Sequence, residues 1–234
     1  MTREFGPGPY VGDSGVVRGF GETLRSVQGP GSDELKFERV LCATCNNARS
    51  QPFDRAYDTF ATFVANNEGS ILQSRRFRFS DVYGSSWRSA RENLAKYYVK
   101  HVGCRLAQDG IKVEQPILDY LDGRSKILAG LEMTFEIRTD IVALFEHSRL
   151  HGEDFGGALW MGDLYCMYSP STGSIDEVQG FVGYRCLRLN YLYDMRIHRP
   201  RSSFRRNKVN LPQGASVDPS RIEEECEDCK ADKD

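Results

Sequence analysis

The sequence lacks both a long hydrophobic segment and a strong net charge. No stretch approaches the roughly 18 consecutive apolar residues that a membrane-spanning helix needs, and the first residues do not form the apolar core of a signal peptide. A formal net charge of −2 excludes a uniformly basic protein that coats nucleic acids. We therefore expect a soluble, cytoplasmic protein with no membrane partner.

Two common classes of catalytic motif are also missing. The 22 glycines form neither a G-x-G-x-x-G nor a Walker loop between a strand and a helix. No serine lies in a nucleophile elbow. The sequence therefore does not support a nucleotide cradle or a serine hydrolase. Its 40% hydrophobic content nevertheless predicts a globular core rather than general disorder.

Composition divides the 234 residues into four regions. Residues 1–35 form a lead-in rich in glycine and proline, and residues 211–234 form an acidic tail that we expect to be disordered. Between them, residues 36–123 have helical periodicity and residues 124–210 form a β-rich domain. Helices followed by antiparallel strands predict an α+β fold.

The helical periodicity comes in three stretches. Asp54 is a suitable N-cap for a first helix that ends near Asn67, and Ser80 caps a second helix that continues to His101. A short third helix has Pro116 in its first turn and ends at Gly123.

After residue 124 the hydrophobic period changes to two. Apolar and polar side chains alternate along residues 131–137, which predicts a half-buried strand. Further strands are expected at 141–145, 158–168 and 181–193, and the Pro/Gly/Ser-rich segment 169–174 should turn the last two into a hairpin.

Opposite charges are segregated along the chain. Residues 73–107 contain eight basic and two acidic side chains, and residues 185–208 contain eight basic side chains and one acidic one. Such segments are suited to binding phosphate backbones, or they are solvated faces balanced by the acidic regions. The candidate nucleic-acid-binding residues of the first segment are Arg75, Arg76, Arg78, Arg88, Arg91, Lys96 and Lys100.

Seven cysteines include two pairs with C-x-x-C spacing, which favours metal binding or reduced thiols over a disulfide framework. Cys42 and Cys45 can place two thiolates on one zinc ion from a tight turn that precedes a helix. Three further cysteines are expected to be small buried side chains: Cys104, Cys166 and Cys186.

The segment from Leu41 to Asp54 reads L-C-A-T-C-N-N-A-R-S-Q-P-F-D and resembles the second half of an HNH endonuclease-like module. The resemblance implies a ββα-metal fold, DNA as substrate, and structural zinc held by Cys42 and Cys45. It also implies a catalytic role for Asn46 beside a divalent ion such as Mg²⁺, with Asp54 near the same ion.

Residues 1–41 contain no His, Cys or Asn, so the first cysteine pair and the general-base histidine of that family are absent here. We expect a truncated or catalytically degenerate relative, or one completed by a partner chain that supplies the missing half. The alternative is a non-enzymatic module that binds nucleic acid or protein through its Arg-rich segments.

Cys226 and Cys229 form the second C-x-x-C pair, and with Cys42 and Cys45 they would complete a four-sulfur zinc site. Their acidic neighbours disfavour the thiolate form, so the alternative is a free or redox-labile dithiol. His147 and His151 lie four residues apart in a predicted loop, where helical spacing does not apply, and are expected to be ordinary surface histidines.

Overall fold

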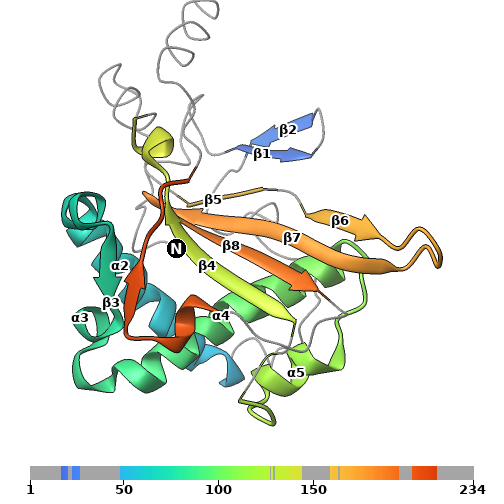
Figure 1. Ribbon diagram of the computed structural model, residues 1–234, viewed down its shortest axis with the longest axis horizontal. Coiled ribbons are helices and arrows are strands. Elements are labelled where there is room, and N and C mark those ends of the chain that lie inside the picture. The colour runs from blue at the N-terminus through green and yellow to red at the C-terminus, as the bar shows by residue number, and fades with distance from the viewer. Residues whose placement is uncertain are drawn as a thin grey trace, which may run out of the picture.

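The computed structural model describes residues 17–20, 23–26, 48–126, 128, 130–143, 159–162, 164–194 and 202–214. Within these ranges the long helices lie in the first half of the chain and cover one face of a sheet formed by the second half (Figure 1). The predicted α+β fold is therefore confirmed. No helix in these ranges is both long enough and apolar enough to cross a bilayer.

The helical elements are α2 (Gln51–Ser74), α3 (Phe79–Tyr83), η4 (Gly84–Ser86), α4 (Trp87–Gln108), α5 (Gln115–Leu121) and η5 (Ser203–Arg205). The strands are β1 (Val17–Phe20), β2 (Thr23–Ser26), β3 (Arg76–Arg78), β4 (Leu131–Ile137), β5 (Leu159–Met161), β6 (Tyr165–Tyr168), β7 (Ile175–Tyr184), β8 (Leu187–Asp194) and β9 (Lys208–Asn210).

The strands form three antiparallel sheets in the described residues. The largest has the order β4-β8-β7-β5, with β6 also paired to β7. β1 pairs with β2, and β3 pairs with β9 across more than 120 residues of chain. The β4 strand alternates between buried and half-buried residues as its sequence predicts, and the turn at 169–174 joins β6 to β7 in the expected hairpin.

The first helix is longer than expected at both ends. α2 begins after Ser50, with Pro52 in its first turn, and continues past the predicted end to Ser74. Asn67 does not end the helix, and its side-chain amide donates to the Phe63 carbonyl at 2.8 Å within the same helix. The helix ends only where Arg75 adopts a left-handed conformation with φ of 50°.

The second predicted helix is interrupted. Gly84 has φ of +60°, a value that helical residues do not adopt, and it separates α3 from α4 through the short η4 turn. The third helix matches its prediction: Pro116 lies in the first turn of α5, and Gly123 follows its end with φ of 75°.

Three strand predictions need correction. Residues 139–143 are helical, so the strand predicted at 141–145 is wrong. The strand predicted at 158–168 is divided into β5 and β6 around Gly162. The one predicted at 181–193 contains a tight turn at Arg185 and Cys186, between Tyr184 of β7 and Leu187 of β8.

A glutamate from α2 stabilises this turn. Arg185 has φ of 52°, which costs a non-glycine residue about 1–2 kcal/mol. Glu68 Oε2 accepts hydrogen bonds from Arg185 Nε and a terminal guanidinium nitrogen at 3.0 and 2.8 Å. Its other oxygen, Oε1, accepts from the backbone N–H of Cys186 at 3.1 Å. These contacts between distant parts of the sequence offset the backbone strain, and no local turn signal predicts them.

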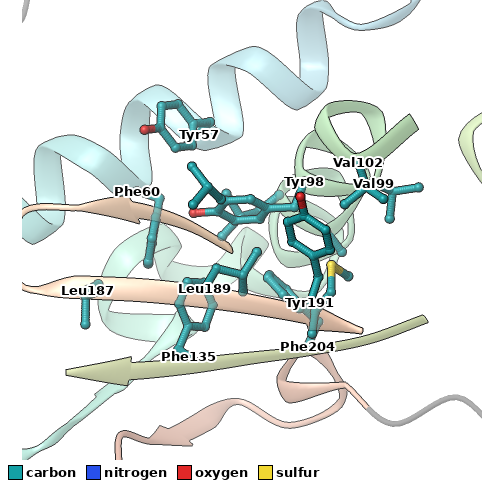
Figure 2. Packing of buried hydrophobic residues seen from close by; sticks show 14 of the residues in the cluster. Tyr57, Phe60, Tyr98, Val99, Val102, Phe135, Leu187, Leu189, Tyr191 and Phe204 are labelled. Atoms are coloured by element: carbon teal, nitrogen blue, oxygen red, sulfur yellow. The ribbon is translucent and has the colours of Figure 1, made fainter. Parts of the chain in front are cut away.

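Phe135 of β4 is the centre of an aromatic core (Figure 2). Its ring centroid lies 5.5 Å from that of Phe60 on α2 and 5.9 Å from that of Tyr98 on α4. It also lies 5.7 Å from the ring of Phe77 on β3 and 5.4 Å from that of Phe204 in η5. Both halves of the chain therefore share one hydrophobic core, which extends to Leu211.

The packed chain extends past residue 210, where the acidic tail was expected to begin. Leu211 is buried, and Gln213 forms a parallel bridge with Ile137 of β4. Residues 215–234 lie outside the described part of the chain. Cys104 and Cys186 are buried as predicted, whereas Cys166 is only partly buried.

We predict that adding one methyl group has opposite effects on stability at Gly180 and at Gly69. A Cβ atom at Gly180 would lie 2.4 Å from the Tyr191 hydroxyl, whereas a Cβ atom at Gly69 on α2 meets nothing within 4 Å. Gly180→Ala should lower the free energy of unfolding by about 1–3 kcal/mol, and Gly69→Ala should raise it by up to about 1 kcal/mol. Urea denaturation measures both, and an equal effect of the two changes would contradict the packing described here.

Candidate nucleic-acid interface

The cysteine and asparagine candidates lie outside the described residues. Cys42, Cys45 and Asn46 precede residue 48, and Cys226 and Cys229 follow residue 214. Within the described ranges, no three His, Cys, Asp or Glu side chains come together as a metal site. The zinc ion, the divalent ion and the catalytic role of Asn46 remain predictions from the sequence.

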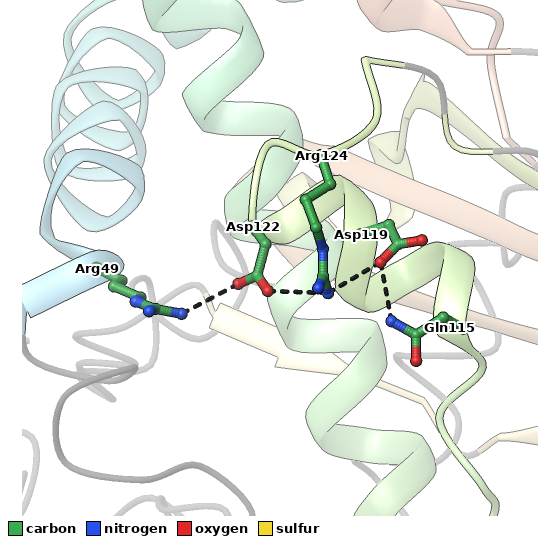
Figure 3. Close-up of polar contacts among 5 residues, drawn as sticks. All are labelled: Arg49, Gln115, Asp119, Asp122 and Arg124. Atoms are coloured by element: carbon green, nitrogen blue, oxygen red, sulfur yellow. Dashed lines mark hydrogen bonds and ion pairs between the residues drawn. The ribbon is translucent and has the colours of Figure 1, made fainter.

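Residues 48–54 of the HNH-like motif are described, and Arg49, Ser50 and Asp54 among them make polar contacts within the fold. Arg49 forms an exposed ion pair with Asp122 at 3.3 Å. As Figure 3 shows, Asp122 also binds Arg124, which in turn binds Asp119 of α5. These exposed pairs tie the start of α2 to the end of α5, although each contributes at most about 1 kcal/mol.

Two further residues of the motif, Ser50 and Asp54, form a polar cluster with Lys100. Lys100 Nζ on α4 donates to Asp54 Oδ1 at 2.7 Å and to Ser50 Oγ at 3.2 Å. The Ser50 hydroxyl donates to Asp54 Oδ2 at 3.0 Å. Asp54, expected near a divalent ion, therefore has a lysine counterion in this structure.

The predicted nucleic-acid-binding residues of α4 are also engaged in contacts. Arg88 and Arg91 lie over the Trp87 ring, with guanidinium carbons 4.7 and 5.0 Å from its centroid. Lys96 lies 5.6 Å from the Phe53 ring and 5.7 Å from the Tyr120 ring. Lys96 and Lys100 are partly buried, so α4 offers fewer accessible cations than its sequence suggests.

The other three candidates, Arg75, Arg76 and Arg78, are exposed and lie beside a second group of cations. β3 pairs with β9 so that Arg76 lies opposite Asn210 and Arg78 lies opposite Lys208. Figure 1 shows these two strands side by side at the edge of the sheet beyond β4.

Exposed and buried side chains alternate along both short strands, so each strand has one side in the core and one side on the surface. Phe77 and Val209 face each other across the pair and are 4% and 3% exposed. Their flanking residues are exposed on both strands. We call the exposed side of this strand pair, with the residues that flank it, the basic ribbon. Arg76, Arg78 and Lys208 lie on its strands, and Arg75, Arg205 and Arg206 flank them.

Several polar contacts fix the ends of the ribbon. At one end, the Asn207 side chain accepts from the Ser80 backbone N–H at 2.9 Å and donates to the Ser80 hydroxyl at 3.1 Å. At the other end, the Arg75 guanidinium donates to Gln213 Oε1 at 3.0 Å, and the Arg75 carbonyl accepts from the Leu211 N–H at 2.9 Å. The backbone of the ribbon is therefore held between α3 and the segment after β9.

The cations of the ribbon have no compensating carboxylates among the described residues. None of the six forms an ion pair with a described Asp or Glu. Arg78 and Lys208 are direct cross-strand neighbours, and like charges in that position are destabilising. An anion bound over the ribbon would relieve this repulsion.

The outer face of the large sheet differs from the basic ribbon in its charge balance. It contains a hollow of about 390 Å³ whose lining includes Glu132, Phe181, Arg188 and Asn190. Arg188 is neutralised by an ion pair with Glu136, which also accepts a hydrogen bond from the Asn190 amide. This hollow offers no unpaired cation among its described residues and does not suit a phosphate.

The sequence predicts both basic segments but not that they pair with each other in the fold. The signal for β3 is a three-residue pattern, Arg-Phe-Arg, and the matching pattern of β9 is Lys-Val-Asn. Patterns this short occur widely, and nothing local indicates that the two strands pair. No family model, curated protein or solved structure matches this chain, so relatives offer no further guide to the site.

We predict that His101 makes the fold sensitive to acid. Burial lowers the pKa of this imidazole to about 3, and the charges of Arg105 and Lys100 act in the same direction. Below about pH 6.5 the unfolded chain binds a proton that the folded chain excludes. Stability should therefore be full above that pH and should fall as the pH falls toward 3.

The measurement is urea unfolding of the wild type and of His101→Gln at about pH 7.5 and about pH 5. The wild type should lose about 1–2 kcal/mol more than the variant over this interval. Equal losses would show that His101 is protonated in the folded protein.

Proposed function

We propose that this protein binds nucleic acid through the phosphate backbone and that the basic ribbon is the binding surface. The observation that carries the proposal is the pairing of β3 with β9, which brings together two distant segments that carry six exposed cations on or beside the paired strands. Lysine and arginine side chains that neutralise phosphates supply most of the affinity of such complexes.

The geometry supports contact with phosphates rather than with bases. The aromatic residues within and beside the ribbon, Phe77, Phe79 and Phe204, are all buried and cannot stack on a base. The inner face of the ribbon is packed against Phe135, so the ribbon cannot enter a major groove as a free β-ribbon does. Binding is therefore independent of sequence and sensitive to salt.

The unrelieved charge supports the same proposal. Opposed Arg78 and Lys208 weaken the strand pair in the free protein. A surface maintained only for solubility would gain stability from an acidic residue at either position. The nuclease activity suggested by the HNH-like motif remains a separate prediction, because its cysteines and Asn46 lie outside the described residues.

We predict that removing ribbon cations weakens DNA binding without weakening the fold. The test variant is Arg78→Gln with Lys208→Gln, and the probe is a duplex of about 20 base pairs titrated at several salt concentrations. Each lost phosphate contact should reduce the slope of log K against log salt by about 0.9. The free energy of unfolding should stay the same or rise by a few tenths of a kcal/mol, because the like-charge pair is gone.

The matched control is Lys112→Gln with Arg124→Gln, which removes two exposed cations near α5. This control has the same net charge as the test variant and should keep the wild-type slope. A slope near zero for the wild type, or equal losses in the two double variants, would contradict the proposal.

A further inference from the structure

The chain leaves the described part of the structure beside the basic ribbon. β9 ends at Asn210, and two hydrogen bonds with Arg75 keep the next residues beside β3: the Leu211 N–H donates to the Arg75 carbonyl, and the Arg75 guanidinium donates to Gln213 Oε1. Gly214 donates its N–H to the Ile137 carbonyl at 2.8 Å. The following residues therefore start from a fixed point next to the ribbon.

The sequence after this point is strongly acidic. Residues 216–234 contain eight acidic and three basic side chains, a net charge of −5. The ribbon contributes six cations without a described carboxylate partner. Asp218, the first acid after Gly214, is four residues away and can reach at most roughly 14 Å from it.

We propose that the acidic segment 216–234 binds the basic ribbon of its own chain and competes there with nucleic acid. The ribbon is the described surface whose charge complements the segment, since the outer face of the sheet carries carboxylates of its own. The competition rests on the proposed function, whereas the contact between segment and ribbon does not.

The physical chemistry of a tethered, charged segment makes this contact reversible. A short tether gives the segment an effective concentration in the millimolar range at the ribbon. Individual exposed ion pairs are weak and are screened by salt. The segment therefore lowers nucleic-acid affinity at low salt without closing the surface permanently, and a phosphate backbone of higher charge density displaces it.

The direct test compares the full-length protein with a full-length variant in which four glutamates of the segment are changed: Glu223→Gln, Glu224→Gln, Glu225→Gln and Glu227→Gln. Backbone amide chemical shifts are recorded by NMR at low and at high salt, without nucleic acid. We expect low-salt shift differences at residues 75–78 and 205–210 that disappear at high salt. Spectra that agree at these residues at low salt would overturn the proposal.

The second measurement is affinity for the same DNA duplex at low salt. The four-glutamate variant should bind about tenfold more tightly than the wild type, as expected for loss of a tethered competitor. The control Asp58→Asn with Glu92→Gln removes exposed acids of α2 and α4 and should change affinity less than twofold. Equal gains per charge in both variants would overturn the competition.

The outcomes separate the two proposals. Amide shifts without any DNA binding, in wild type or variant, would refute the proposed function and leave the contact standing. DNA binding of equal strength in wild type and four-glutamate variant, with unchanged amide shifts, would refute the contact and leave the proposed function standing.

Discussion

The packing of four aromatic rings around Phe135 is the contact on which the rest of this structure depends. Phe60 and Tyr98 bring α2 and α4 to the sheet, and Phe77 and Phe204 bring in the two segments that carry the basic ribbon. Phe77 lies between Arg76 and Arg78, and Phe204 directly precedes Arg205 and Arg206. Successive residues of a strand point to opposite faces, so burial of Phe77 places Arg76 and Arg78 on the surface. Arg205 and Arg206 are exposed directly after the buried Phe204.

The same arrangement explains why charge can accumulate at the ribbon. Hydrophobic burial of Phe77 and Val209 contributes on the order of 2 kcal/mol per side chain, which exceeds the repulsion between two solvent-exposed cations. Polar contacts at Asn207 and Arg75 add geometric restraint at each end of the ribbon. The core thus holds an electrostatically unfavourable surface in place, and an anion bound there would relieve the repulsion. A charge pattern of this kind fits a binding role better than a purely structural one.

The sequence predicts those parts of the fold that depend on local patterns. The alternation of β4, the proline and glycine at the two ends of α5, and the turn at 169–174 all appear as expected. The sequence-based predictions fail where contacts between residues far apart in the sequence determine the local structure. Glu68 stabilises a turn at Arg185 that has no glycine or asparagine signal, and the strand pair of the ribbon has three residues on each side. The candidate site was predictable as two basic segments, but its assembly depends on the shared aromatic core.

The most direct test of the central claim is a hydrogen-exchange footprint of the full-length protein with and without a DNA duplex. If the two basic segments form one binding surface, exchange should slow together at residues 75–78 and at residues 205–210, while β7 and β8 of the large sheet remain unchanged. Slowing confined to α4, to the outer face of the sheet or to one of the two segments alone would contradict the account.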